Sequence, residues 1–216
     1  MLKSENPARE RILRRVRSAL TTQTPLRHSG PTGQIFAPFA DPLERFRQQC
    51  TVNNTEFILT SDTTASAGKI SEVLSSVPPG EIFLQDAPLL RRMAATWTDR
   101  NVRWSSEGPP NEPTRATITL AESLVAATGS VFVSASCGGR NATIVAPVHI
   151  VVATISQLTP TLDTALAGLR ERGTTSRNSM VTLVTGPSRT GDIEKIIVMG
   201  AHGPQRLIVV LASSEQ

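Results

Sequence analysis

The sequence predicts an α/β fold in which helices cover both faces of a parallel or mixed β-sheet. Short runs of β-branched residues alternate with stretches of helical apolar periodicity from residue 56 onward. Such alternation is typical of βαβ units, whose sheets are buried on both faces. The chain has 216 residues, 39% hydrophobic and 19% charged, which is enough to bury one sizeable core.

The first predicted element is a basic amphipathic helix over residues 7–20. Its apolar residues recur at helical spacing, and five arginines occupy the rest of its surface. The apolar stripe is narrow and lacks Trp and Phe, which favours docking on a protein over lying on a membrane. The alternative is that the helix binds nothing and its arginine face is simply solvated. Residues 21–42 are rich in Pro, Gly and Thr and indicate a linker. We therefore expect an N-terminal extension over residues 1–40 and an α/β domain over residues 41–216.

The first half of the domain alternates between helices and strands. Asp41 followed by Pro42 is the pattern of an N-cap and first helical residue, and Gly80 follows two prolines that end a later helix. The predicted helices span residues 41–50, 64–76 and 88–96, and the predicted strands span residues 56–60, 81–85 and 102–104. Trp97 and Trp104 are interpreted as core packing.

The second half follows a loop at residues 105–115. The predicted strands span residues 131–134, 147–152, 180–184 and 206–211, and a helix over residues 161–172 ends at Gly173. Two stretches fit a helix and a strand equally well, and they span residues 117–126 and 193–199.

The composition argues against several classes of function. The formal net charge is +4 with no basic stripe interleaved with aromatics, so nucleic acid is not a predicted partner. The start shows no signal-peptide pattern, and no apolar run reaches about 18 residues, which predicts a cytoplasmic protein without stable membrane insertion. Cys50 and Cys137 lie far apart and form no metal-binding pair. With no dinucleotide fingerprint or P-loop either, we expect no metal and no cofactor in this chain.

The richest polar chemistry lies in residues 185–204, TGPSRTGDIEKIIVMGAHGP, directly after a predicted strand. Backbone N–H groups in such a turn can converge on one point, and the neighbouring side chains add donors. A second tight turn follows and presents an imidazole. The candidate ligand-binding residues of the two turns are Gly186, Ser188, Arg189, Thr190, Asp192, His202 and Gly203. This pattern predicts a cradle for a small anion, although an ordinary strand exit with an Arg189–Asp192 ion pair would use the same residues.

Three further residues are candidates on weaker grounds. Arg140 follows a Gly-Gly pair, where a loop can admit a ligand or simply make a wide turn. His149 lies at the mouth of the buried strand predicted over residues 147–152, a position more often structural than catalytic. Cys137 would need a base and an oxyanion site beside it to act as a nucleophile, so an inert thiol is favoured.

Several segments together resemble the LUD-domain family, which includes lactate utilization protein C. They are ARERILRRVRSAL, AESLVAATGSVFV, GGRNATIVAPVHIVVATISQLTP and TGPSRTGDIEKIIVMGAHGP, and the likeness is strongest from about residue 116 to the end. The resemblance implies a three-layer α/β sandwich with a mainly parallel sheet, similar to the NagB/RpiA/CoA-transferase group. It also implies a role in oxidising L-lactate to pyruvate together with two iron–sulfur proteins, whose clusters lie in those partners.

The chain departs from the family pattern at one turn. Members usually carry an acidic residue before the Thr-Gly pair, whereas Ala127 precedes Thr128 and Gly129 here. Thr128 and Gly129 stay in the candidate ligand-binding set, but the carboxylate that would suit covalent or acid–base chemistry is missing. Glu122 matches a separate acidic position. The candidate catalytic residues are therefore Glu122, His149 and His202, without an assigned reaction.

Two hypotheses from different classes follow. The first is a non-redox component of a multi-protein lactate-oxidation system that binds a small anionic ligand or a partner, more a subunit than an independent catalyst. Its ground is that lactate oxidation removes two electrons, and this chain offers neither cluster cysteines nor a dinucleotide site. The second is a stand-alone enzyme of the same fold that acts on a phosphosugar, an acyl-CoA or a folate-like substrate, because open α/β sheets collect ligands at strand exits.

Overall fold

The computed structural model describes residues 7–21, 36–97, 99–110, 113–190, 198–199 and 203–214. The chain divides into two compact units, residues 1–37 and 38–216. Most of the predicted linker, and residues 191–197 and 200–202 of the predicted cradle, lie outside the described residues. No helix in the described ranges combines the length and apolarity needed to cross a membrane.

The first unit contains helix α1 (Pro7–Thr21), which confirms the predicted basic helix. None of its residues is buried, and the apolar side chains of Ile12, Val16 and Leu20 are 61%, 49% and 79% exposed. Docking of this apolar stripe on a partner stays a prediction.

The second unit is built on a six-stranded sheet in which every neighbouring pair is parallel. In spatial order its strands are β1 (Glu56–Thr60), β12 (Arg206–Ala212), β7 (Val148–Thr154), β4 (Thr114–Leu120), β2 (Glu81–Leu84) and β3 (Val102–Trp104). All seven residues of β7 are buried, as expected for a central parallel strand covered on both faces. The predicted α/β class with a mainly parallel sheet is confirmed.

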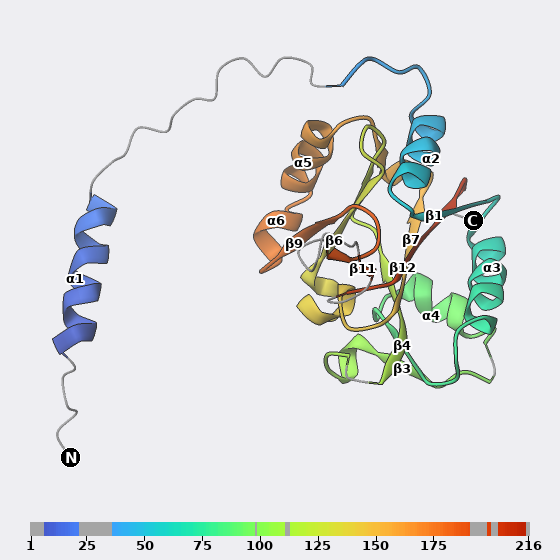
Figure 1. The fold of residues 1–216 in the computed structure, drawn as a ribbon, viewed down its shortest axis with the longest axis horizontal. Coiled ribbons are helices and arrows are strands. Elements are labelled where there is room, and N and C mark those ends of the chain that lie inside the picture. The colour runs from blue at the N-terminus through green and yellow to red at the C-terminus, as the bar shows by residue number, and fades with distance from the viewer. Residues whose placement is uncertain are drawn as a thin grey trace. The chain divides into compact units, whose positions relative to one another are not determined.

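Helices α3 (Thr63–Ser75) and α4 (Pro88–Ala94) cover one face of this sheet (Figure 1). Asp62 caps α3 by accepting a hydrogen bond from the Ala65 N–H at 2.8 Å. Ile70 of α3 and Leu90 of α4 are both 0% exposed and pack over the isoleucines of the central strands. These contacts hold the two helices against this face of the sheet.

The opposite face is covered by helix α2 (Pro42–Val52) and by a second sheet that the sequence did not predict. The strands of this second sheet, in spatial order, are β8 (Leu158–Thr159), β5 (Ser123–Val125), β6 (Ser130–Ser134) and β9 (Val181–Val184). Helix α5 (Leu162–Glu171) packs on its outer side through Ala165 and Leu169, and the short helix α6 (Thr174–Arg177) follows (Figure 1).

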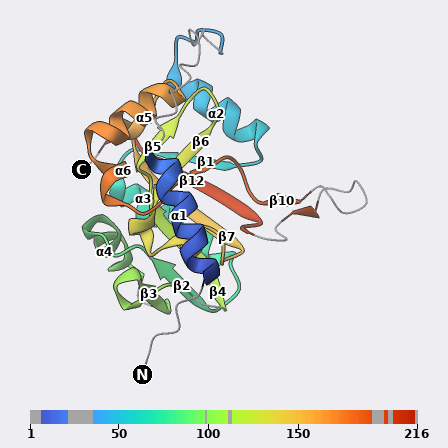
Figure 2. The same cartoon turned by 90° about the vertical axis from the view of Figure 1, so that its left-hand side faces the viewer.

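Within the described ranges the connections contain four 3-10 turns and a short ribbon. The turns are η1 (Ser105–Glu107), η2 (Ala135–Cys137), η3 (Arg140–Thr143) and η4 (Ile155–Gln157). The ribbon pairs β10 (Arg189–Thr190) with β11 (Val198–Met199) and projects from the side of the domain (Figure 2).

Two expectations need correction. The pattern at residues 180–184 predicts a buried strand, but among the described strands β9 pairs only with β6 at the edge of the second sheet, and Leu183 is 41% exposed. The loop expected at the Gly-Gly pair before Arg140 is short, because the 3-10 turns η2 and η3 flank Gly138 and Gly139 directly. The ambiguous stretch at residues 117–126 forms β4 and β5, because the chain turns at Ala121–Glu122 and crosses from one sheet to the other.

Candidate functional site

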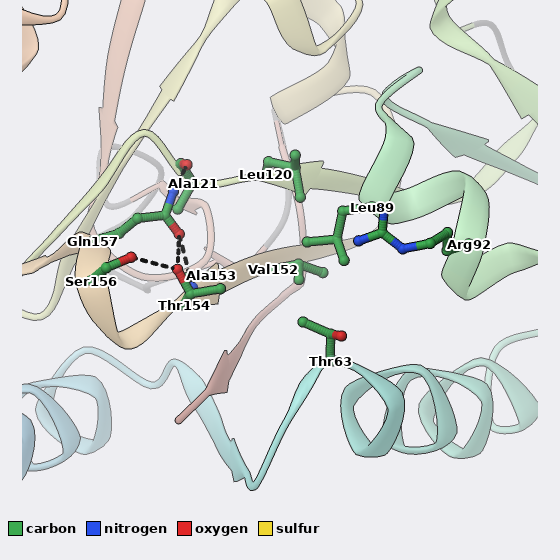
Figure 3. Close-up of a pocket in the computed structure, with 10 residues that line it drawn as sticks. All are labelled: Thr63, Leu89, Arg92, Leu120, Ala121, Val152, Ala153, Thr154, Ser156 and Gln157. Carbon is green, nitrogen blue, oxygen red and sulfur yellow. Dashed lines mark hydrogen bonds between the residues drawn. The ribbon is translucent and has the colours of Figure 1, made fainter. Parts of the chain in front are cut away.

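The parallel strands of the large sheet end at one common edge, and a pocket of about 320 Å³ lies where β4 and β7 end (Figure 3). Open α/β sheets characteristically bind ligands at this edge. Its walls come from the first residue of α3, from α4, from the ends of β4 and β7, and from η4. The pocket is therefore the leading candidate for a functional site.

One wall of the pocket is a hydrogen-bonded group of Thr154, Ser156 and Gln157. The Thr154 hydroxyl lies 2.9 Å from the Ser156 hydroxyl, and the Thr154 N–H donates to Gln157 Oε1 at 2.8 Å. Gln157 Nε2 in turn donates to the carbonyl of Ala121, which ties η4 to the end of β4. These bonds hold the side chain of Ser156, an exposed residue, at the pocket wall.

The other wall carries a cation. Arg92 extends from α4 with its guanidinium directed toward the pocket, across from Thr154 (Figure 3). Within the described ranges Arg92 makes no ion pair or hydrogen bond, and no Asp or Glu lines the pocket. A guanidinium among hydroxyls without a carboxylate favours binding of an anion.

Arg91, the neighbour of Arg92 on α4, is by contrast paired within the protein. Arg91 donates two hydrogen bonds to Asp86, at 2.6 and 2.8 Å, and its guanidinium lies 4.5 Å from the Trp104 ring centroid. These hydrogen bonds lower the pKa of Asp86 to about 2. Arg91 therefore serves the structure of the domain, whereas the charge of Arg92 is open to a ligand.

The predicted cradle lies at the opposite edge of the sheet, where β12 and β1 begin. The Ser188 N–H donates to the carbonyl of Pro204 at 2.8 Å, and a Cβ added to Gly203 would lie 3.0 Å from the Ser188 Cβ. The two turns are thus adjacent. Asp192 and His202 lie outside the described residues, and of Thr190 only the backbone, in β10, is described.

Four of the predicted ligand-binding residues gather around Asn53, the C-cap of α2. The Arg189 guanidinium donates to the Asn53 carbonyl, which also lies 2.5 Å from a Cβ added to Gly186. The Asn53 side chain donates to the carbonyl of Thr128 at 2.7 Å. Gly129 packs against the backbone of α2. The contacts of these four residues therefore hold the carboxyl-terminal end of α2.

The remaining candidates are separate from both places. Arg140 opens η3 with an exposed side chain. Glu122 accepts a hydrogen bond from the Ser134 hydroxyl at 2.5 Å, and its carbonyl accepts one from Arg172. Cys137 is buried, which raises its pKa to about 12, so its thiol is protonated at neutral pH.

His149 is enclosed in the core and does not reach the pocket. Its side chain shares the face of β7 that carries Val151 and Ala153, turned toward α2 and the second sheet. His149 is 0% exposed, and its Nε2 lies 2.9 Å from the Thr119 hydroxyl. Burial lowers its pKa to about 4, so the imidazole is neutral at physiological pH. This agrees with the structural interpretation of the residue.

The sequence patterns do not single out the residues of the pocket. Arg92 belongs to a predicted helix whose apolar periodicity marks only the core-facing side, and Thr154, Ser156 and Gln157 follow a predicted strand. The usable signal is position, because polar residues that follow parallel strands meet at one edge of the sheet.

Comparisons with known proteins agree with this fold. A family model described as the LUD domain matches residues 111–212. Lactate utilization protein C from Geobacillus thermodenitrificans strain NG80-2 is 26% identical over 85% of this chain and 84% of that protein. The protein of the same name from Geobacillus sp. strain WCH70 is 26% identical over 94% of this chain and 91% of its own length.

Two more similarities span most of the chain. Lactate utilization protein C from Bacillus subtilis strain 168 is 26% identical over 77% of this chain and 76% of that protein. A crystal structure of a DUF162 family protein from Deinococcus radiodurans aligns with 81% of this chain and 99% of that chain, with a TM-score of 0.62 and 19% identity. This last likeness shows a shared fold.

Proposed function

We propose that this protein, which belongs to the LUD-domain family, is a non-redox component of a multi-protein system that oxidises L-lactate to pyruvate. Relatives named lactate utilization protein C match most of the chain and support a role in lactate utilization. The partners are two iron–sulfur proteins, and this chain binds a small anionic ligand for the assembly.

The observation that carries the proposal is Arg92 in the pocket at the carboxyl ends of β4 and β7, whose guanidinium has no partner among the described residues. L-lactate and pyruvate are carboxylates, and a guanidinium can bind a carboxylate through two parallel hydrogen bonds. The Ser156 and Thr154 hydroxyls on the facing wall suit the second oxygen of a 2-hydroxy or 2-oxo acid. The pocket thus offers donors for both polar ends of such a molecule.

The chemistry of the cysteines supports the non-redox part of the proposal. Oxidising lactate to pyruvate removes two electrons, and iron–sulfur clusters are held by sets of cysteine thiolates. This chain has two cysteines, and burial raises the pKa of Cys50 and of Cys137 to about 12. The electrons therefore pass to the partner proteins. Two buried, unpaired thiols also suit a reducing compartment such as the cytoplasm.

The test combines binding and turnover. Isothermal titration of the purified chain with L-lactate and with pyruvate should show binding that Arg92→Gln abolishes. Arg189→Gln is the matched control, because that guanidinium already engages the Asn53 carbonyl at the other edge of the sheet. Loss of binding in Arg189→Gln with retention in Arg92→Gln would move the site to the predicted cradle and refute the pocket.

Turnover is measured with L-lactate and an artificial electron acceptor. The chain alone should give no pyruvate, and addition of the two iron–sulfur proteins should give pyruvate at a rate that depends on this chain. Appreciable oxidation by the chain alone would contradict the non-redox assignment.

A stand-alone enzyme acting on an acyl-CoA, a phosphosugar or a folate-like substrate is the second candidate. It is favoured by one observation, namely that the Arg92 pocket adjoins a second cavity between α3 and α4, which together give more room than lactate needs. A thermal-shift panel of lactate, phosphosugars, folates and CoA esters separates the two functions, since a shift with a CoA ester and none with lactate would select the enzyme.

A further inference from the structure

A second cavity, of about 400 Å³, lies between helices α3 and α4 and adjoins the Arg92 pocket. Thr63, Leu89 and Arg92 line both cavities, so the two adjoin at these residues. We call this extension the α3–α4 groove. Its other lining residues are Thr64, Ala67 and Gly68 of α3, Met93 of α4 and Thr96, which follows α4.

The α3–α4 groove differs in chemistry from the pocket that it extends. Ala67 and Met93 are buried at its floor, and Leu89 forms part of its wall. Gly68 leaves the groove open, because a Cβ built there would meet no atom within 4 Å. Thr64 and Thr96, which are both exposed residues, also line the groove. The groove therefore offers apolar surface that a hydrocarbon chain could cover.

Arg92 stands where the polar and apolar parts meet. No Asp or Glu lines either cavity within the described residues, so the guanidinium is the charge that a ligand would meet. An anion bound there has hydroxyl donors on one side and an apolar channel on the other. A small hydroxy acid would fill only the first side.

We infer that the site accepts carboxylates with an unbranched hydrocarbon chain, the carboxylate beside Arg92 and the chain along the α3–α4 groove over Gly68. The inference rests on the proposed anion site at Arg92 and extends it to a class of longer ligands. Chain length beyond that of lactate should then add affinity, because each methylene that enters the groove leaves water.

The test is isothermal titration of the full chain with acetate, butanoate, hexanoate and octanoate. Burial of one CH₂ is worth about 0.8 kcal/mol, so Kd should fall about fourfold for each methylene until the groove is filled. Arg92→Gln should remove binding of the whole series, since each member relies on the same guanidinium.

Gly68→Leu places a side chain inside the groove, and octanoate should then bind no more tightly than acetate. Lys69→Leu is the matched control, because it adds the same side chain at the next position of α3, which does not line the groove. Chain-length dependence should survive in Lys69→Leu. Circular dichroism and thermal unfolding check the fold of both variants.

The possible failures are distinguishable. Equal affinity across the series, with binding still lost in Arg92→Gln, would overturn the chain-binding inference and leave the anion site standing. Chain-length dependence that persists in Gly68→Leu would show that the tail binds elsewhere and would also overturn it. Absence of binding by every carboxylate, lactate included, would refute the anion site itself.

Discussion

Thr117 of β4 and His149 of β7 are cross-strand neighbours, and each presents a buried polar atom that has no hydrogen-bond partner among the described residues. These atoms are the Thr117 hydroxyl oxygen and the His149 Nδ1. Both residues lie on the α2 side of the sheet, and Thr119 satisfies only the Nε2 of the ring. Burial without a charged partner disfavours the imidazolium, which makes the neutral ring part of the folded state.

The first prediction is a loss of stability on mild acidification that comes from His149. Its pKa is lowered from 6.5 to about 4 in the folded protein, so the unfolded chain binds the proton first as the pH falls below 6.5. The neutral His149 contributes its full stabilisation above pH 6.5, the pKa of the unfolded chain, and this contribution is lost as the pH falls toward the folded pKa of about 4. Between pH 7.5 and pH 5 the free energy of unfolding should fall by about 2 kcal/mol. Urea unfolding of His149→Gln over this range should show a correspondingly weaker pH dependence. Equal pH dependence in both proteins would contradict the burial effect.

The sheet can be predicted from the sequence more fully than the site. Short apolar runs mark strands, so the buried strands β2 and β12 and the partly exposed edge strand β1 are all predicted at nearly their observed bounds. The second sheet cannot be predicted from the sequence, because the apolar pattern of β9 matches that of any short strand. Only the tertiary contact shows that β9 pairs with β6. The chemistry of the residue 185–204 turns is visible in the sequence, but the edge of the sheet that they occupy is not.

The second prediction concerns Gly129, whose φ of 64° closely matches that of Gly173 at 67°. A Cβ at Gly129 would lie 2.8 Å from the Gln49 carbonyl carbon, whereas at Gly173 the nearest atom is the Ser176 hydroxyl at 3.4 Å. Gly173→Ala should cost about 1 kcal/mol through backbone strain alone. Gly129→Ala should cost a further 1–3 kcal/mol or so, because α2 must move. Urea unfolding measures both, and equal costs would mean that the end of α2 shifts freely.

The third prediction is that both thiols are unreactive in the folded protein. Burial raises the pKa of Cys50 and of Cys137 to about 12, so at pH 8 thiolate is scarce and reaction with a thiol reagent such as DTNB should be roughly a thousandfold slower than in the unfolded chain. The absorbance change on mixing, with and without denaturant, gives both rates. Prompt reaction that Cys137→Ser removes would restore Cys137 as a candidate nucleophile.

The last prediction separates the two neighbouring arginines of α4. Arg91→Gln removes the bidentate contact with Asp86 and the stacking on Trp104, so the melting temperature should fall while lactate binding persists. The pKa of Asp86, about 2 in the folded protein, should also return toward its ordinary value. In the unmodified protein that low pKa gives stability above about pH 4 that is lost as the pH falls through about 2, and Arg91→Gln should lose this part of the acid-unfolding profile.

Arg92→Gln should behave in the opposite way, keeping the melting temperature and acid profile and losing the ligand, because its guanidinium has no protein partner within the described residues. If Arg92→Gln lowered the melting temperature as much as Arg91→Gln does, Arg92 would be a structural residue and the pocket would have no cation to offer.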